Sequence, residues 1–104
     1  MSSSTSTSRT LSGKTILITG ASSGIGRSTA CEFARTSPES LKLILTARRL
    51  DRLHDIARQI REDVGDGVKI HVKQFDVSRA EEIEGLIGSL PEEFRQIDVL
   101  VNNA

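Results

Sequence analysis

An alternation of short apolar runs with segments of helical periodicity constrains this chain more than any other feature. Apolar runs lie at 15–19, 41–47 and 97–101, and a segment of alternating apolar and polar residues lies at 68–77. Between them, apolar side chains recur every three or four residues, a pattern typical of amphipathic helices. Strands that are apolar throughout, separated by helices, predict a parallel sheet covered on both faces, an α/β fold.

Three helices are expected between these four strands. Their apolar faces are formed by Ile25, Thr29, Ala30, Phe33 and Ala34, then by Leu53, Ile56, Ala57, Ile60 and Val64, and last by Ile83, Leu86, Ile87 and Leu90. A capping box over 78–81 would begin the third helix. Right-handed crossovers favour the strand order 3-2-1-4, a partial Rossmann fold with three layers, α/β/α. Ligands of such folds bind at the carboxyl ends of the strands, where the strand order reverses, here between the first and fourth strands.

The loop after the first strand has glycines at a spacing suited to a pyrophosphate. Gly20 permits a tight turn, Gly24 lets the backbone approach the phosphates, and Gly26 lets the helix pack closely. The helix N-terminus offers N–H groups to anions. A P-loop is excluded because five residues, not four, separate Gly20 from Gly26 and no lysine follows. The predicted cofactor-binding residues of the loop are Gly20, Ser22, Ser23, Gly24, Ile25 and Gly26.

Two motifs together resemble the classical short-chain dehydrogenase/reductase family. Thr19 and the three glycines are similar to its T-G-x-x-x-G-I-G signature, and Asn102-Asn103-Ala104 is similar to the start of its N-N-A-G motif after the fourth strand. The resemblance covers about residues 12–104. It implies that Asn102 contacts the adenosine side of a dinucleotide and that Asn103 stabilises the adjoining turn. A purely structural role for either asparagine is the alternative.

The end of the second strand favours NADP over NAD. An NAD site commonly has an Asp or Glu there for the ribose 2′-hydroxyl, whereas this chain has Ala47, Arg48 and Arg49. A carboxylate would repel the 2′-phosphate of NADP, but arginine can bind it through two hydrogen bonds. We therefore predict that Arg48 and Arg49 hold the 2′-phosphate, with Arg27 as a further candidate. The alternatives are a solvated Arg27 and pairing of Arg49 with Asp51 or other nearby acids.

The resemblance also assigns residues at the end of the third strand. It implies that Asp76 hydrogen-bonds the adenine amino group and that the N–H of Val77 caps the ring; the alternative for Asp76 is a turn or helix cap before Ser78. The segments 43–50 and 90–94 are similar to fungal and bacterial NADP-dependent 3-hydroxy acid (serine or allo-threonine) dehydrogenases.

The chemistry of the family requires a Tyr-x-x-x-Lys pair and a serine beyond the fourth strand. The lysine lowers the pKa of the tyrosine, which exchanges a proton with the substrate oxygen. This sequence contains no tyrosine, so we predict no catalytic residue in it and expect the chain alone to be inactive. The resemblance therefore implies a fragment: the NADP(H)-binding portion of an oxidoreductase, whose small-molecule substrate binds only in an intact parent. A non-catalytic dinucleotide-binding or interaction module is the alternative.

Composition narrows the partners and the compartment. Lys and Arg number 14, as do Asp and Glu, so we expect neither nucleic acid nor an anionic membrane as partner. No apolar run approaches the roughly 18 residues of a membrane-spanning helix. The single cysteine, Cys31, cannot form an internal disulfide, which favours a reducing, cytoplasmic location, and we expect it to be buried. His54 and His71 lack zinc-ligand spacing, so no metal site is predicted.

The ends of the chain carry two further expectations. The Ser/Thr-rich segment 1–12 is interpreted as a disordered leader, with a transit peptide as the weaker alternative, and 13–104 as the half-domain, truncated after the fourth strand. The fourth strand would lie on an unpaired edge with a charge only at Asp98. We expect this edge to make the chain marginally stable and prone to self-association.

Overall fold

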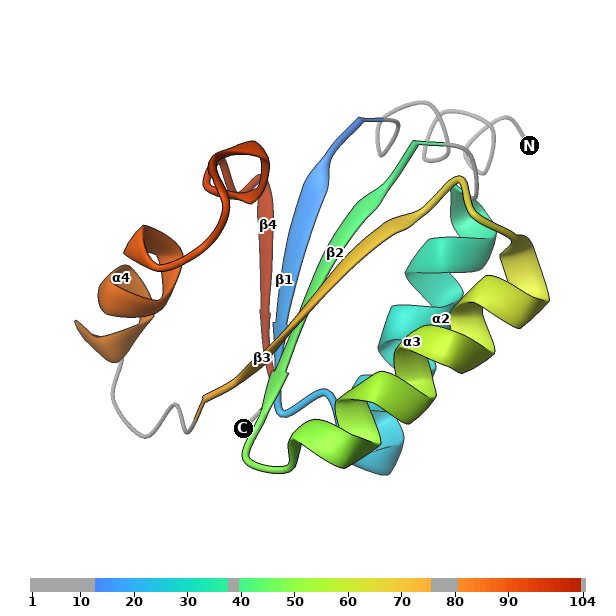
Figure 1. Ribbon diagram of the computed structural model, residues 1–104, viewed down its shortest axis with the longest axis horizontal. Coiled ribbons are helices and arrows are strands. Elements are labelled where there is room, and N and C mark those ends of the chain that lie inside the picture. The colour runs from blue at the N-terminus through green and yellow to red at the C-terminus, as the bar shows by residue number, and fades with distance from the viewer. Residues whose placement is uncertain (1–12, 38–39, 76–80, 104) are drawn as a thin grey trace.

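Strands and helices alternate along the chain in the computed structural model, which describes residues 13–37, 40–75 and 81–103 (Figure 1). The elements are β1 (Thr15–Thr19), α2 (Gly24–Thr36), β2 (Lys42–Ala47), α3 (Leu50–Val64), β3 (Lys69–Gln74), α4 (Glu81–Gly88), the 3₁₀ helix η1 (Glu92–Phe94) and β4 (Val99–Asn102). The predicted leader and most of the predicted capping box lie outside the described residues.

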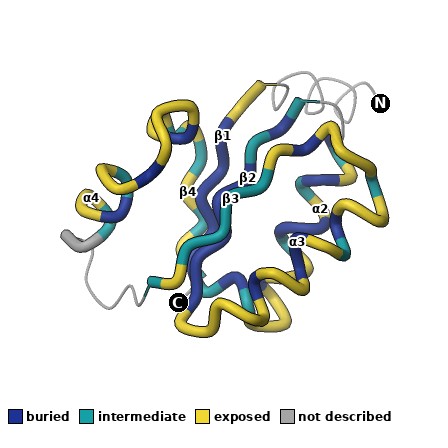
Figure 2. The backbone as a smooth tube through the Cα atoms, viewed as in Figure 1, coloured by how far each residue is buried: buried dark blue, intermediate teal, exposed yellow. Residues whose placement is uncertain are grey.

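The four strands form one parallel sheet in the order β3-β2-β1-β4, which confirms the predicted topology. In the register of the sheet, Leu17 of β1 pairs with Ile44 of β2 on one side and with Leu100 of β4 on the other. Every residue of β1 is buried, as is every residue of β2 after Lys42 (Figure 2). These two central strands are buried along nearly their whole length because helices cover both of their faces.

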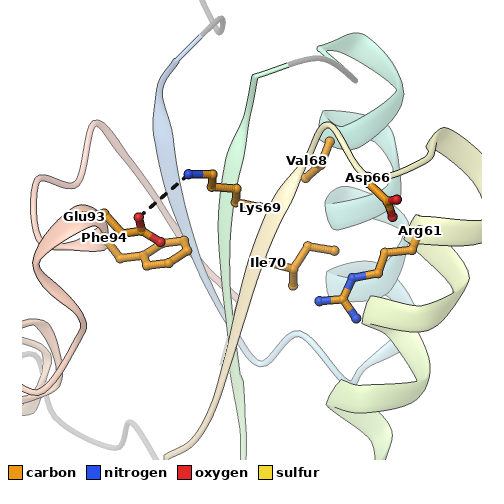
Figure 3. A pocket seen from close by; sticks show the side chains of 7 residues that line it. All are labelled: Arg61, Asp66, Val68, Lys69, Ile70, Glu93 and Phe94. Carbon is orange, nitrogen blue, oxygen red and sulfur yellow. Dashed lines mark ion pairs between the residues drawn. The ribbon is translucent and has the colours of Figure 1, made fainter.

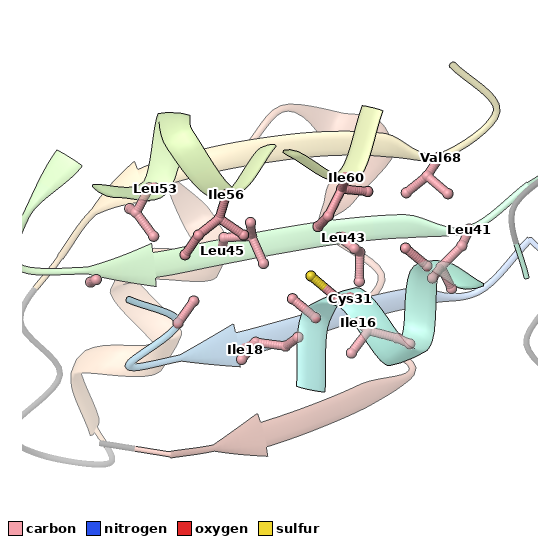
Figure 4. Packing of buried hydrophobic residues seen from close by; sticks show 14 residues of the cluster. Ile16, Ile18, Cys31, Leu41, Leu43, Leu45, Leu53, Ile56, Ile60 and Val68 are labelled. Carbon is pink, nitrogen blue, oxygen red and sulfur yellow. The ribbon is translucent and has the colours of Figure 1, made fainter. Parts of the chain in front are cut away.

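Helices α2 and α3 lie on one face of the sheet and α4 on the other, which confirms the three predicted layers (Figure 1). The larger apolar cluster joins the sheet to α2 and α3 (Figure 4). It includes Ile16 and Ile18 from β1, Leu43 and Leu45 from β2, and Cys31, which is buried as predicted. The strand positions alternate because successive side chains of a strand point to opposite faces.

A smaller cluster fills the opposite face. There Leu17 and Ile44 pack with Leu86, Leu90 and Phe94, all of them at most 5% exposed. Phe94 belongs to η1, a 3₁₀ turn that the sequence analysis did not predict. Helix α4 ends before Leu90, so this leucine reaches the core from the turn that follows the helix.

The fourth strand begins at Val99 and not at Ile97 as predicted, for two physical reasons. Ile97 packs into the α4-side cluster. Asp98 then exchanges two bonds with Thr15: its N–H donates to the Thr15 carbonyl at 2.9 Å, and its Oδ2 accepts the Thr15 N–H at 2.9 Å. A side chain replaces one backbone acceptor at Asp98, and the strand starts at the next residue, Val99.

Candidate functional site: a crevice at the carboxyl ends of β1 and β4

The hydroxyl of Ser23 links the glycine loop, the start of α2 and the end of β4. Its Oγ accepts the Gly26 N–H at 3.1 Å and an Nδ2 hydrogen of Asn103 at 2.9 Å, and it donates to the Gly20 carbonyl at 3.0 Å. A hydroxyl has one hydrogen and two lone pairs, so these three bonds use its full capacity. Ser23 therefore acts as the N-cap of α2 and positions the loop.

Two glycines of the loop have backbone requirements that explain their identity. Gly20 has φ +61°, in the left-handed region that glycine adopts without strain. A Cβ on Gly26 would lie 2.4 Å from the Gly20 carbonyl oxygen and 2.9 Å from Nδ2 of Asn103. No side chain larger than hydrogen fits there, so the predicted role of Gly26 in close packing is confirmed.

The first turn of α2 is open on its outer side. A Cβ placed on Gly24 would meet no atom within 4 Å, and Ile25 is 73% exposed. The spacing of Ile25 predicted that it would belong to the apolar face of the helix, and this prediction is wrong. Gly26, Ala30 and Ala34 form that face. The N–H groups at such a helix start have no intrahelical acceptor. An anion could thus reach the backbone at Gly24 without meeting a side chain.

Thr19 and Asn102 fasten β4 to β1 at the same end of the sheet. The buried Thr19 hydroxyl donates to Oδ1 of Asn102 at 2.8 Å and accepts the N–H of Asn103 at 3.0 Å. The two motifs predicted to converge on the switch point, more than 75 residues apart, are therefore joined by direct hydrogen bonds.

The end of β2 lies beside the loop because the N–H of Ala21 donates to the Thr46 carbonyl at 2.9 Å. Arg48 and Arg49 follow directly and are both exposed. The Arg48 carbonyl accepts a hydrogen bond from Nε2 of Gln74 at 2.9 Å, which fixes its backbone to β3. Within the described part of the chain neither guanidinium forms an ion pair, so the alternative pairing of Arg49 with Asp51 is not seen there.

A cavity of about 230 Å³ adjoins the loop on the side of α3. It is lined by Ser22, Arg27, Arg52, Asp55 and Ile56. The Arg27 guanidinium donates to Oε1 of Gln59 on α3, so this arginine is held against the neighbouring helix instead of being freely solvated. The sequence analysis did not find this cavity. Its one signal was the recurrence of arginine at 48, 49 and 52.

A second cavity, of about 310 Å³, lies at the amino ends of the strands, around the start of β3 (Figure 3). Lys69 and Glu93, whose side chains form an ion pair at 3.7 Å, line it together with Phe94 and Arg61. Ligands of doubly wound sheets bind at the carboxyl ends of the strands, so this cavity is not the candidate site.

Several sequence expectations fall outside what the structure describes. Asp76, Val77 and Ala104 lie outside the described residues, so the structure gives no geometry for their predicted contacts.

Among the described helices, none combines the length and apolar character needed to cross a membrane. The described residues also contain no group of three or more His, Cys, Asp or Glu side chains arranged to hold a metal ion.

A parallel sheet with a glycine loop at its switch point defines a dinucleotide-binding fold. The family model of the short chain dehydrogenases matches residues 14–104 of this sequence. The chain therefore belongs to the short-chain dehydrogenase family, as its two motifs predicted.

Curated relatives of the chain include an NADP-dependent 3-hydroxy acid dehydrogenase and a serine dehydrogenase. It is 51% identical over 94 residues to an NADP-dependent 3-hydroxy acid dehydrogenase of Schizosaccharomyces pombe, a match that covers 90% of this chain and 35% of the relative. It is 42% identical over 90 residues to a serine 3-dehydrogenase of Agrobacterium fabrum, with 86% and 32% covered. The chain thus spans about a third of the length of these relatives.

Solved structures agree with this assignment. L-sorbose reductase of Gluconobacter frateurii, solved with NADPH and L-sorbose, is 39% identical and superimposes with a TM-score of 0.75 over 90% of this chain and 34% of its own. A short-chain dehydrogenase of Sphingobium yanoikuyae, solved in complex with NADPH, is 40% identical, with a TM-score of 0.68 over 88% and 34%.

Proposed function

We propose that this chain is the NADP(H)-binding portion of a short-chain dehydrogenase/reductase that interconverts CH–OH and carbonyl groups, with 3-hydroxy acids as its substrate class. The observation that carries the proposal is the crevice in which Ser23, Asn103 and the glycine loop are hydrogen-bonded together beside two exposed arginines. NADP(H), when bound, supplies or accepts the hydride. The relatives described above support the cofactor and the substrate class.

The described residues fit a dinucleotide with a 2′-phosphate. The open backbone at Gly24 and the start of α2 would receive the pyrophosphate, because unpaired N–H groups and the helix dipole favour an anion there. Arg48 and Arg49 would hold the 2′-phosphate. Ser22, and not Ser23, would offer the loop hydroxyl, because all three hydrogen-bonding positions of Ser23 are occupied within the protein.

The share of the chemistry that we assign to this chain is binding and orientation. Asn102, Asn103 and Ala104 would flank the cofactor, and Asp76 and Val77 would contact the adenine. Proton transfer is assigned to a serine and a Tyr-x-x-x-Lys pair that the family has beyond the fourth strand, and this sequence contains no tyrosine. We also propose a cytoplasmic location, where NADP(H) and a free thiol at Cys31 are compatible.

Calorimetric titration of the 104-residue chain with NADP⁺ and NAD⁺ tests the binding role. We expect a dissociation constant for NADP⁺ of order micromolar, with weaker binding of NAD⁺. Arg48→Ala should weaken the binding of NADP⁺ by about 1.5–3 kcal/mol, the usual contribution of a hydrogen bond to a charged group, and should leave the binding of NAD⁺ nearly unchanged. Millimolar binding of NADP⁺, or an equal loss for both cofactors, would contradict the assignment.

The reaction is tested with a protein that carries this sequence together with the catalytic motif. NADP⁺-dependent oxidation of serine or another 3-hydroxy acid, followed through NADPH absorbance, is the expected result. Micromolar NADP⁺ binding without turnover on any such substrate would favour the non-catalytic module instead.

A further inference from the structure

We propose that Arg52, on the first turn of α3, is a specificity-determining residue that selects the phosphorylated dinucleotide, with Arg27 and Ser22 lining the same cavity. The inference rests on the proposed NADP(H)-binding function and extends the 2′-phosphate site beyond the pair Arg48 and Arg49. Its starting point is the cavity of about 230 Å³ that Ser22, Arg27 and Arg52 line together.

Ser22 connects this cavity to the site proposed for the 2′-phosphate, because it lines the cavity and belongs to the glycine loop. The neighbouring residue, Ala21, is hydrogen-bonded to Thr46 of β2 at 2.9 Å, so Ser22 lies beside the end of the strand that leads into Arg48. A phosphate placed between Ser22 and Arg48 would therefore border the cavity.

Arg52 stands on the first turn of α3, close in the sequence to the predicted ligands of the 2′-phosphate. Arg49 is the N-cap of α3, and Arg52 follows three residues later. Both arginines therefore stand at the amino end of α3, and Arg52 lines the cavity there. The start of α3 holds these two arginines and one acid, Asp51, and cations are unfavourable at the positive end of a helix dipole, so a bound anion would be favoured there.

No acid among the described residues forms an ion pair with Arg52. Asp55, which lines the cavity, pairs with Arg58 at 2.9 Å. Within the described ranges, Arg52 forms no ion pair or side-chain hydrogen bond. Arg27, by contrast, is held by Gln59, which keeps its guanidinium at the cavity wall. One fixed and one uncommitted arginine thus face a space that adjoins the phosphate loop.

Calorimetric titration of the 104-residue chain with NADP⁺ and with NAD⁺ tests the inference on Arg52→Gln. We expect the dissociation constant for NADP⁺ to rise about five- to tenfold, which corresponds to about 1–1.4 kcal/mol, and that for NAD⁺ to change less than about twofold. Arg52→Lys keeps the charge but loses the planar fork, so it should give an intermediate loss.

Arg61→Gln is the matched control. It removes the same charge from the same helix, nine residues away, or about 13 Å along the axis, where salt screens its effect on the site. An unchanged NADP⁺ affinity in Arg52→Gln, or an equal loss of affinity in the control, would overturn the role of Arg52. The proposed function would still stand in that case, provided that the wild-type chain prefers NADP⁺ to NAD⁺. Failure of the wild-type chain to prefer NADP⁺ would instead contradict the proposed function itself.

Discussion

The Asn103 side-chain amide donates to the hydroxyl of Ser23 at 2.9 Å, across 80 positions of the sequence. The bond connects the residue that follows β4 to the residue that caps α2. Because the Ser23 hydroxyl also binds Gly20 and Gly26, one side chain holds the glycine loop in shape and attaches it to the residue that follows β4. The shape of the glycine loop is therefore linked to the position of the fourth strand.

A double-mutant cycle of Ser23→Ala and Asn103→Ala should show that the two residues are coupled. Ser23→Ala removes a helix cap and should lower the free energy of unfolding by about 0.5–2 kcal/mol. The coupling energy should be about 0.5–1.5 kcal/mol, the net contribution of one hydrogen bond. Urea unfolding of the four proteins measures both quantities, and strictly additive losses would show that the bond contributes nothing to stability.

Alanine at Gly26 and at Gly24 should have opposite effects. Gly26→Ala places a Cβ 2.4 Å from a backbone oxygen, and the resulting overpacking should cost about 1–3 kcal/mol of unfolding free energy. Gly24→Ala meets nothing within 4 Å, and alanine favours a helix, so the chain should be as stable or slightly more so.

The same pair of variants also separates packing from binding. Gly24→Ala should weaken the binding of NADP⁺ in calorimetric titration, because the added methyl group would occupy the space proposed for the pyrophosphate. This loss is expected without any loss of unfolding free energy. A Gly24→Ala chain with wild-type affinity would remove Gly24 from the proposed site.

Local pattern predicted the sheet of this protein well because its central strands are buried on both faces. β1 and β2 each contain a run of three large apolar residues and are buried at nearly every position, a pattern that admits few other structures. The loop was equally predictable, since the close approach at Gly26 excludes any side chain. Backbone geometry of this kind leaves its signature in the residue type.

Features that depend on distant contacts could not be predicted in this way. The third hydrogen bond of the Ser23 hydroxyl comes from Asn103, and the start of β4 at Val99 depends on the hydrogen bond between Thr15 and Asp98. Ile25 has the spacing of a core residue, yet it precedes the point at which α2 meets the sheet and is exposed. The burial of Phe94 depends on η1, which is too short to produce a periodic pattern.

The imidazole of His71 should make stability depend on pH. Burial, and then the nearby charge of Lys73, lower the pKa of His71 below its ordinary value of 6.5. The unfolded chain therefore binds the proton more readily, so the contribution of His71 is fully present above pH 6.5 and is lost as the pH falls below it toward the folded pKa.

Urea unfolding of the wild type and of His71→Gln, at a pH above 6.5 and at a pH below the folded pKa of His71, checks the direction of this pH dependence. The wild type should lose more unfolding free energy on acidification than His71→Gln does. His54→Gln removes an exposed imidazole and leaves the surroundings of His71 intact, so the additional loss should persist in it. An identical pH dependence in the wild type and in His71→Gln would contradict the prediction.

The outer edge of β4 should cause the 104-residue chain to self-associate. β4 pairs with β1 on one side, and the described residues provide no strand for its other side, so its backbone groups there can pair with another chain. Leu100 adds an apolar side chain that is 46% exposed beside this edge. Sedimentation velocity at increasing protein concentration should therefore show a rising weight-average sedimentation coefficient.

A lysine at Leu100 should suppress this association, because a charge beside an open edge disfavours strand pairing between chains. Ile25→Lys is the matched control: Ile25 is more exposed, at 73%, but lies at the start of α2, away from the open edge. If exposed apolar surface in general drove association, the control would reduce it at least as strongly. We expect Leu100→Lys alone to shift the chain to monomer, and a wild-type chain that stays monomeric at every concentration would show that the edge is not adhesive.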